Sequence, residues 1–206
     1  MGRAPDPDAE LMLRVKRGDL EAFEALVEKY KQPLVNFIAR SLGDAEEAQD
    51  LAQSAFLQAF RAAPRYKPTA RFSTWLFVIA RNLCLNELRR RSRRPAESAD
   101  AREEAFERGG PRTLPDAARP GPAQEALRGE LLEKVEEAIR ELPEPQRTAL
   151  LLCVQTDLSY EEIARTLGCS LSAAKSLIHR ARQTLKRRLR PYLRSGEWRP
   201  AGQGGS

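Results

Sequence analysis

The stretch from Asp157 to Arg190 limits the possible folds most, because it reads as a short helix, a tight turn and a longer helix. Ser159 and Glu162 have the spacing of a capping box, in which each side chain bonds the backbone N–H of the other residue. Gly168 suits the left-handed position that ends a helix, and Ser170 suits the cap of the next one. This order predicts a helix-turn-helix.

The longer helix of this motif has two different faces. Apolar residues recur at helical spacing on one face: Ala174, Ile178, Ala181 and Leu185. Basic residues recur on another: Lys175, His179, Arg182 and Lys186. No acidic residue occurs between Leu171 and Gly196. Exposed helix faces usually mix charges of both signs, so the unopposed cationic face indicates a helix that enters the major groove of DNA.

Charge elsewhere in the chain agrees with a polyanionic partner. Lys and Arg number 35 against 29 Asp and Glu, which gives a net charge of +6. The bases cluster at residues 65–94 and 175–194, whereas acids cluster at 44–50, 97–107 and 130–144. Two separate basic blocks predict two nucleic-acid surfaces on one chain.

Several function classes are excluded by composition. The three cysteines are widely spaced and there is one histidine, which is too few ligands for a zinc site. We therefore predict reduced thiols and neither a metal nor a cofactor. No apolar run approaches the ~20 residues of a membrane span, and no signal peptide is recognisable. A cytoplasmic protein with no membrane insertion is expected.

The first half of the chain reads as helical from residue 8, with residues 1–7 expected to be frayed. A third helix is predicted from Asp44 to Ala63. Besides its apolar side it carries a mixed face, made of Asp50, Gln53, Ser54 and Leu57. That face fits simple solvent exposure as well as partner binding.

A basic loop and a basic helix follow. The loop, Pro64 to Arg71, contains three bases and a tyrosine, and the helix from Ser73 to Arg94 carries amides and arginines. This helix ends in five arginines within six positions, which we expect no nearby acid to neutralise. A site for single-stranded nucleic acid needs cations that bind the phosphate backbone, aromatic rings on which bases stack, and amides that bond base edges.

Prolines and glycines interrupt every periodic pattern in residues 95–124, which predicts a flexible linker. The fold class is therefore all-α, with two small helical domains, residues 1–94 and 125–193, joined by this linker. The second is the helix-turn-helix domain. Residues 194–206 are too polar and glycine-rich to fold alone and are expected to form a disordered tail.

Three segments in this order resemble the extracytoplasmic-function (ECF) group of bacterial RNA polymerase sigma factors: Glu46–Phe60, Phe72–Arg91 and Leu142–Leu189. The resemblance covers about residues 8–94 and 125–193. It implies a sigma factor that binds core RNA polymerase and directs promoter-specific transcription initiation. It also implies an anti-sigma factor as a further partner.

The resemblance implies roles for individual residues. Those matching the surface that docks on core polymerase are Asp50, Leu51, Gln53 and Leu57. Those matching the region that holds the single-stranded −10 element are Arg65, Tyr66, Lys67, Arg71, Trp75, Arg81, Asn82, Asn86, Arg89 and Arg90. Those matching contacts to the duplex −35 element are Ser172, Lys175, Ser176, His179, Arg180 and Arg182.

Two other interpretations remain. A free-standing helix-turn-helix regulator would bind a palindromic site by itself, with residues 8–94 serving for dimerisation or sensing. The cationic helix from Ser73 to Arg94 argues against it, because its charge would repel a dimer partner. A helical nuclease would need carboxylates that converge on a metal ion. The acids of residues 44–50 lie in a first helical turn without further ligands nearby, so no catalytic residue is predicted.

Overall fold

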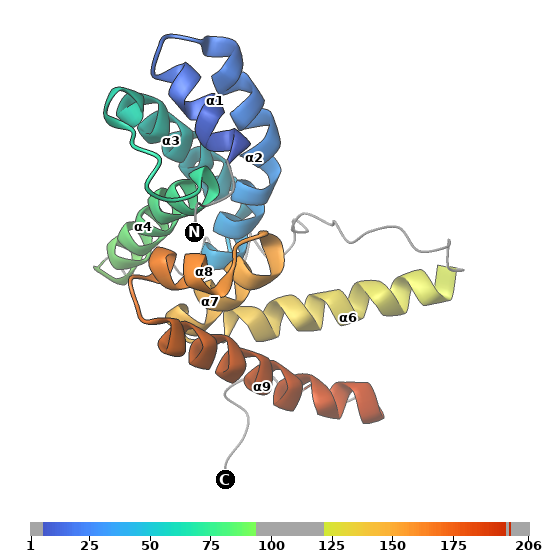
Figure 1. Ribbon diagram of the computed structural model, residues 1–206. Coiled ribbons are helices and arrows are strands. Elements are labelled where there is room, and N and C mark those ends of the chain that lie inside the picture. Colours follow the sequence, from blue (N-terminus) through green and yellow to red (C-terminus); the bar gives the residue numbers. More distant parts are fainter. Residues whose placement is uncertain (1–5, 94–121, 197, 199–206) are drawn as a thin grey trace.

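The computed structural model describes residues 6–93, 122–196 and 198, and every regular element within these ranges is a helix (Figure 1). The prediction of an all-α fold is confirmed. Most of the predicted linker and of the predicted tail lies outside the described residues. None of the helices in the described ranges combines the length and apolar character needed to cross a bilayer.

The first part contains four helices and a short 3-10 turn. These are α1 (Pro7–Val15), α2 (Leu20–Leu42), α3 (Ala45–Ala62), η1 (Ala63–Arg65) and α4 (Phe72–Arg93). Asp19 and Asp44 cap α2 and α3 through their carboxylates. Gly43 ends α2 with a positive φ of 73°, which glycine adopts without strain. Helix α2 passes Pro33 without interruption.

Asp6 is held in place before α1, contrary to the expectation of fraying at residues 6 and 7, whereas residues 1–5 lie outside the described residues. Its carboxylate accepts from the backbone N–H of Asp8 at 3.3 Å and from that of Phe72 at 2.8 Å. The Asp6 side chain therefore accepts hydrogen bonds from two backbone N–H groups, one in the first turn of α1 and one in the first turn of α4. The second contact joins residues far apart in sequence, so local pattern gives no sign of it.

The second part contains α6 (Pro122–Arg140), α7 (Glu144–Gln155), α8 (Tyr160–Leu167) and α9 (Leu171–Ser195). The capping box forms as predicted: the Ser159 N–H donates to Glu162 at 2.9 Å, and the Glu162 N–H donates to the Ser159 hydroxyl at 3.3 Å. Gly168 is left-handed with φ 68°, and Ser170 caps α9. The helix-turn-helix is thus α8 followed by α9.

Two predicted boundaries are corrected at this end of the chain. Helix α6 begins at Pro122, so residues 122–124 are helical and not linker, since proline fits the first helical turn. Helix α9 continues to Ser195, beyond the predicted limit of the domain. Trp198 also packs edge-on against Tyr192, with 6.4 Å between ring centroids, so part of the expected tail contacts the fold.

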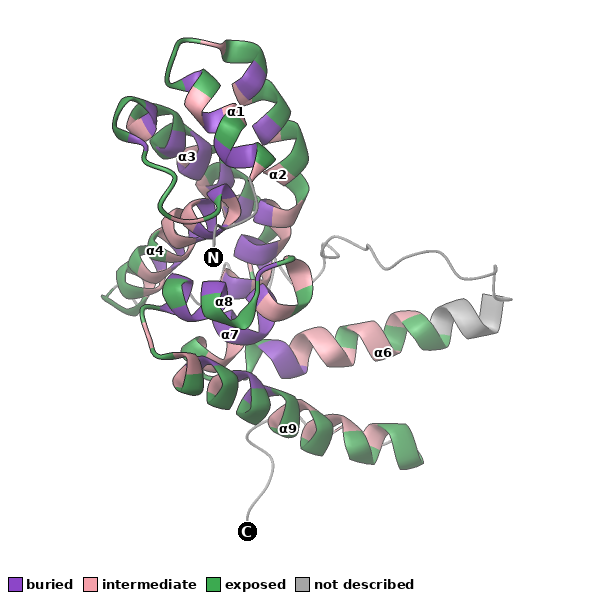
Figure 2. Cartoon of the chain, in the orientation of Figure 1, coloured by how far each residue is buried: buried purple, intermediate pink, exposed green. Residues whose placement is uncertain are grey.

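The two parts pack against each other and share one continuous set of buried apolar residues (Figure 2). Helix α2 contacts α6 and α7, and α4 contacts α8. Fully buried residues on both sides include Phe37, Phe77, Leu151 and Ile163. Figure 1 shows α6 and α9 extending from this common body on the same side. The sequence predicted two domains, and the structure adds a buried contact between them.

Candidate nucleic-acid interface

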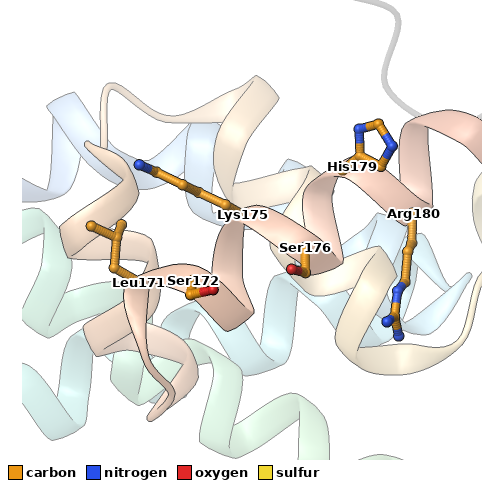
Figure 3. Close-up of a pocket in the computed structure, with 6 residues that line it drawn as sticks. All are labelled: Leu171, Ser172, Lys175, Ser176, His179 and Arg180. Carbon is orange, nitrogen blue, oxygen red and sulfur yellow. The ribbon is translucent and has the colours of Figure 1, made fainter.

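Helix α9 presents a cationic face because its opposite face is fixed in the core. Ala174, Ile178 and Ala181 are buried against α7 and α8, which orients the helix. A hollow of about 730 Å³ lies over the first turns of α9 (Figure 3). It is lined by Leu171 and by five of the six predicted −35 residues: Ser172, Lys175, Ser176, His179 and Arg180. The structure therefore brings the predicted recognition residues together.

Two cations at the hollow, Lys175 and Arg180, have no partner among the residues that the structure describes. Among the residues that the structure describes, neither Lys175 nor Arg180 forms an ion pair or a side-chain hydrogen bond, and α9 contains no acid. Both side chains are exposed. A cation with no partner in the protein can contact a phosphate or a base edge without breaking an existing bond.

Arg182 differs from the other predicted −35 residues. Its Nη2 atom lies 3.4 Å from the sulfur of Cys153 on α7. The side chain is exposed, but this contact directs it along the junction of α7 and α9. It lies outside the hollow, which agrees with a contact to the phosphate backbone rather than to a base.

The second basic surface is formed by the loop before α4 and by one face of that helix. Arg65, Lys67 and Arg71 are exposed. Asn82, Asn86 and Arg89 are also exposed, and their spacing of four and three residues places them on one side of α4. Amides and cations therefore follow one another along the helix, as the sequence predicts for a single-strand surface.

Tyr66 and Trp75 pack against each other and fix the loop between η1 and α4. Tyr66 is only 4% exposed, and its ring centroid lies 5.0 Å from that of Trp75. Lys16 on α1 also donates to the Tyr66 carbonyl at 3.2 Å. A buried ring must move before it can stack on a base. In this conformation the half-buried Trp75 is the more accessible of the two aromatic residues predicted for the −10 region.

The expectation that the terminal arginines of α4 lack nearby acids is wrong. Glu87, one turn earlier, accepts from Arg90 at 2.7 and 2.8 Å and from Arg91 at 2.8 Å. Arg91 also donates to Asp44 on α3 at 2.8 Å. Arg90 is thus tied to the protein, and Arg81 is half-buried, so neither is as available to DNA as Arg89. Sequence reasoning overlooked Glu87 although it lies within helical reach.

The predicted polymerase-docking face lies on the outside of α3. Asp50 and Gln53 are exposed, and Leu57 is 46% exposed. Leu51 is half-buried and packs against the core, so it supports this face more than it extends it. Exposed carboxylate, amide and apolar groups on one helix face are suited to binding a protein partner.

Comparison with known proteins assigns a family to each part of the chain. The family described as Sigma-70 region 2 matches residues 26–94, and that described as Sigma-70, region 4 matches residues 132–185. The RNA polymerase sigma-H factor of Pseudomonas aeruginosa is 41% identical, over 92% of this chain and 97% of its own length. The ECF RNA polymerase sigma-E factor of Escherichia coli K12 is 36% identical, over 91% of this chain and 96% of its own.

Two solved structures share the fold. CnrH, in complex with the cytosolic domain of CnrY, has a TM-score of 0.62 and 24% identity, covering 90% of this chain and 99% of that one. The sigma factor RpoE of Bartonella quintana, in complex with the anti-sigma factor NepR, has a TM-score of 0.60 and 24% identity. The match covers 80% of this chain and 94% of that one.

A helix-turn-helix, matches to both sigma-70 regions and relatives that are 36–41% identical over nearly their whole length define a transcription initiation factor. The chain belongs to the ECF group of RNA polymerase sigma factors. Membership of this family supports a sigma factor over a free-standing helix-turn-helix regulator.

Proposed function

We propose that this chain binds core RNA polymerase through α3 and gives it promoter specificity through two DNA surfaces. Asp50, Gln53 and Leu57 would contact the polymerase, with Leu51 supporting them from within. The face of α9 would read the duplex −35 element. The loop before α4 and the exposed side of α4 would hold the opened −10 strand. No chemical reaction is assigned to the chain.

The observation that supports this proposal best is the pair of exposed cations at the hollow on α9, Lys175 and Arg180, which have no partner within residues 6–93, 122–196 and 198. Lys175 and Arg180 extend from a helix whose other face is fixed in the core. This is the geometry of a recognition helix, in which a few side chains reach base edges while neighbouring groups contact phosphates. Each well-formed bidentate base contact discriminates by about 1–3 kcal/mol.

Opening of the −10 element requires favourable contacts of its own. Extruding a base costs a few kcal/mol, and stacking on an aromatic ring returns about 1–3 kcal/mol per base. Trp75 would supply a ring, Asn82 and Asn86 would bond base edges, and Arg65, Lys67 and Arg89 would neutralise phosphates. Family membership makes an anti-sigma factor a further proposed partner, of the kind bound in the Bartonella quintana structure.

A selection experiment tests the proposal. A random duplex library would be bound by this protein alone and by this protein with bacterial core polymerase, followed by sequencing and by a strand-opening assay. The proposal expects selective binding and opening only when core polymerase is present. Selection of one duplex site by the protein alone, with no effect of core polymerase, would contradict it. Absence of DNA cleavage with magnesium is expected in the same samples.

A further inference from the structure

The loop between η1 and α4 is held at both of its ends by α1. At the start of the loop, the Lys16 ammonium donates to the Tyr66 carbonyl at 3.2 Å. At its end, the Asp6 carboxylate accepts from the Phe72 N–H at 2.8 Å. Asp6 and Lys16 are the residues that cap the two ends of α1. Each end of this helix therefore bonds one end of the loop.

Helix α1 is itself fixed to α2 by a buried carboxylate. Asp8 is only 7% exposed, and both of its oxygens accept from the Lys29 ammonium at 2.7 Å. The Tyr30 hydroxyl donates to the same carboxylate. Burial and this hydrogen bond raise the pKa of Tyr30, so its hydroxyl remains a donor. The Tyr30 ring also packs on Phe72, with 5.4 Å between centroids. Helix α1 is thus a fixed support for the loop.

The loop needs such a support because it has little regular structure. Residues 66–71 belong to no helix, and a single short turn, from the Thr69 N–H to the Lys67 carbonyl at 2.8 Å, lies within them. Two exposed cations of the proposed −10 surface, Lys67 and Arg71, belong to this segment. Ordering a loop during binding lowers affinity, so a loop that is ordered beforehand binds more tightly and in one geometry.

We propose that Asp6 and Lys16 are positioning residues of the −10 surface, which fix the backbone of residues 66–72 so that the loop meets the opened strand in one geometry. The inference rests on the proposed function, because it assigns this loop to the −10 strand. Neither residue belongs to the set predicted for −10 contacts, and the Sigma-70 region 2 match begins only at residue 26. Both act through the loop and govern discrimination between sequences, since base-edge contacts specify sequence whereas phosphate contacts do not.

Two variants release one end of the loop each. Lys16→Met keeps the apolar stem and removes the donor to Tyr66, whereas Lys16→Arg restores a cationic donor. Arg17→Met is the matched control, because it removes the same charge from the neighbouring exposed residue. Asp6→Asn still caps α1, but asparagine has one acceptor oxygen. It cannot replace both carboxylate oxygens, which now accept separately from the N–H groups of Asp8 and Phe72.

Strand selectivity of the holoenzyme, this protein bound to bacterial core polymerase, is the measurement. The unmodified holoenzyme selects from a random pool of single-stranded DNA, and sequencing identifies the enriched strand. Anisotropy of fluorescein-labelled DNA then gives each variant's affinity for the enriched strand and for the unselected pool. Loss of folded protein or of charge lowers both affinities alike, whereas a displaced loop lowers their ratio. The ratio should fall about 3- to 10-fold in Lys16→Met and in Asp6→Asn, the usual net effect of one hydrogen bond. Lys16→Arg and Arg17→Met should retain it.

An unchanged ratio in Lys16→Met or in Asp6→Asn would overturn the positioning role of that residue. An equal fall in Arg17→Met or in Lys16→Arg would overturn the role of the Lys16 hydrogen bond. Failure of the proposed function would look different. Replacing Arg65 and Lys67 together with alanine should weaken binding of the enriched strand, and if it does not, the −10 assignment is wrong. If it does while both α1 variants keep their ratio, the −10 surface stands and the positioning role of α1 does not.

Discussion

Arg91 of α4 donates to Asp44 of α3, with 2.8 Å between Nη2 and Oδ2. The other oxygen of Asp44 accepts from the Glu47 N–H at 3.0 Å and caps α3. Arg91 is only 17% exposed, and it also donates to Glu87 at 2.8 Å. The end of the proposed −10 helix is therefore tied to the start of the proposed polymerase-docking helix. Charged groups at this junction hold two proposed binding surfaces in a fixed relation.

Replacing Arg91 with methionine should destabilise the protein. The variant keeps most of the apolar stem but leaves Asp44 and Glu87 without their shared partner. Hydrogen bonds to charged groups contribute about 1.5–3 kcal/mol, so the free energy of unfolding should fall by about that amount in urea titrations. Arg93→Met, at an exposed site of the same turn, is the control and should change it by less than about 0.5 kcal/mol.

The Glu87 cluster should give a pH-dependent stability. Hydrogen bonds from Arg90, assisted by those from Arg91, hold the pKa of Glu87 below its ordinary value of 4.5. A carboxylate whose pKa is lower in the folded state stabilises the fold above its unfolded pKa, and this contribution is lost as pH falls through the folded pKa. The stability difference between the unmodified protein and Glu87→Gln should therefore be constant near neutral pH and shrink below about pH 4.5. A difference that does not shrink would contradict this role.

Lys175→Ala and Arg180→Ala should each weaken promoter-specific initiation. If each makes a base contact, the loss is about 1–3 kcal/mol, or roughly 5- to 150-fold in promoter affinity of the holoenzyme. Binding to core polymerase should be unchanged, because both residues lie on α9. Arg194→Ala, at the exposed far end of the same helix, serves as the control. Loss of polymerase binding in a pull-down of either variant would contradict the assignment.

The double variant Asp50→Ala, Gln53→Ala should have the opposite effect. Both side chains are exposed on α3 and the helix is capped elsewhere, so the fold should persist. Affinity for core polymerase should fall at least about tenfold, the equivalent of ~1.4 kcal/mol. Circular dichroism controls for folding. Unchanged affinity for core polymerase in a fluorescence titration would contradict the assignment of this face to polymerase docking.

The three cysteines should differ in reactivity. Burial raises the pKa of the Cys84 thiol to about 12, and only 4% of the residue is exposed. Cys153 and Cys169 are half-buried. Alkylation requires the thiolate, so iodoacetamide at pH 8 should modify Cys153 and Cys169 well before Cys84, as followed by mass spectrometry. In 6 M guanidinium all three should react together. Early modification of Cys84 in the native protein would contradict its burial.

Local pattern determined the helix-turn-helix and most helix limits. The capping box of Ser159 and Glu162, the left-handed Gly168 and the Ser170 cap depend on residues at most four positions apart, so sequence spacing predicts them well. The cationic face of α9 was also predictable from the helical spacing of its basic residues. Pattern also placed Asn82, Asn86 and Arg89 on one exposed face of α4.

Contacts between distant residues could be found only in the tertiary structure. Asp6 caps a helix that begins at residue 72, Tyr66 is buried against Trp75, and Arg91 meets Asp44. Arg71 and Glu162, predicted for separate domains, form an ion pair. A helix period reports which side chains share a face, because successive residues turn by a constant angle. It carries no information on which other helix that face meets, since packing depends on the whole chain.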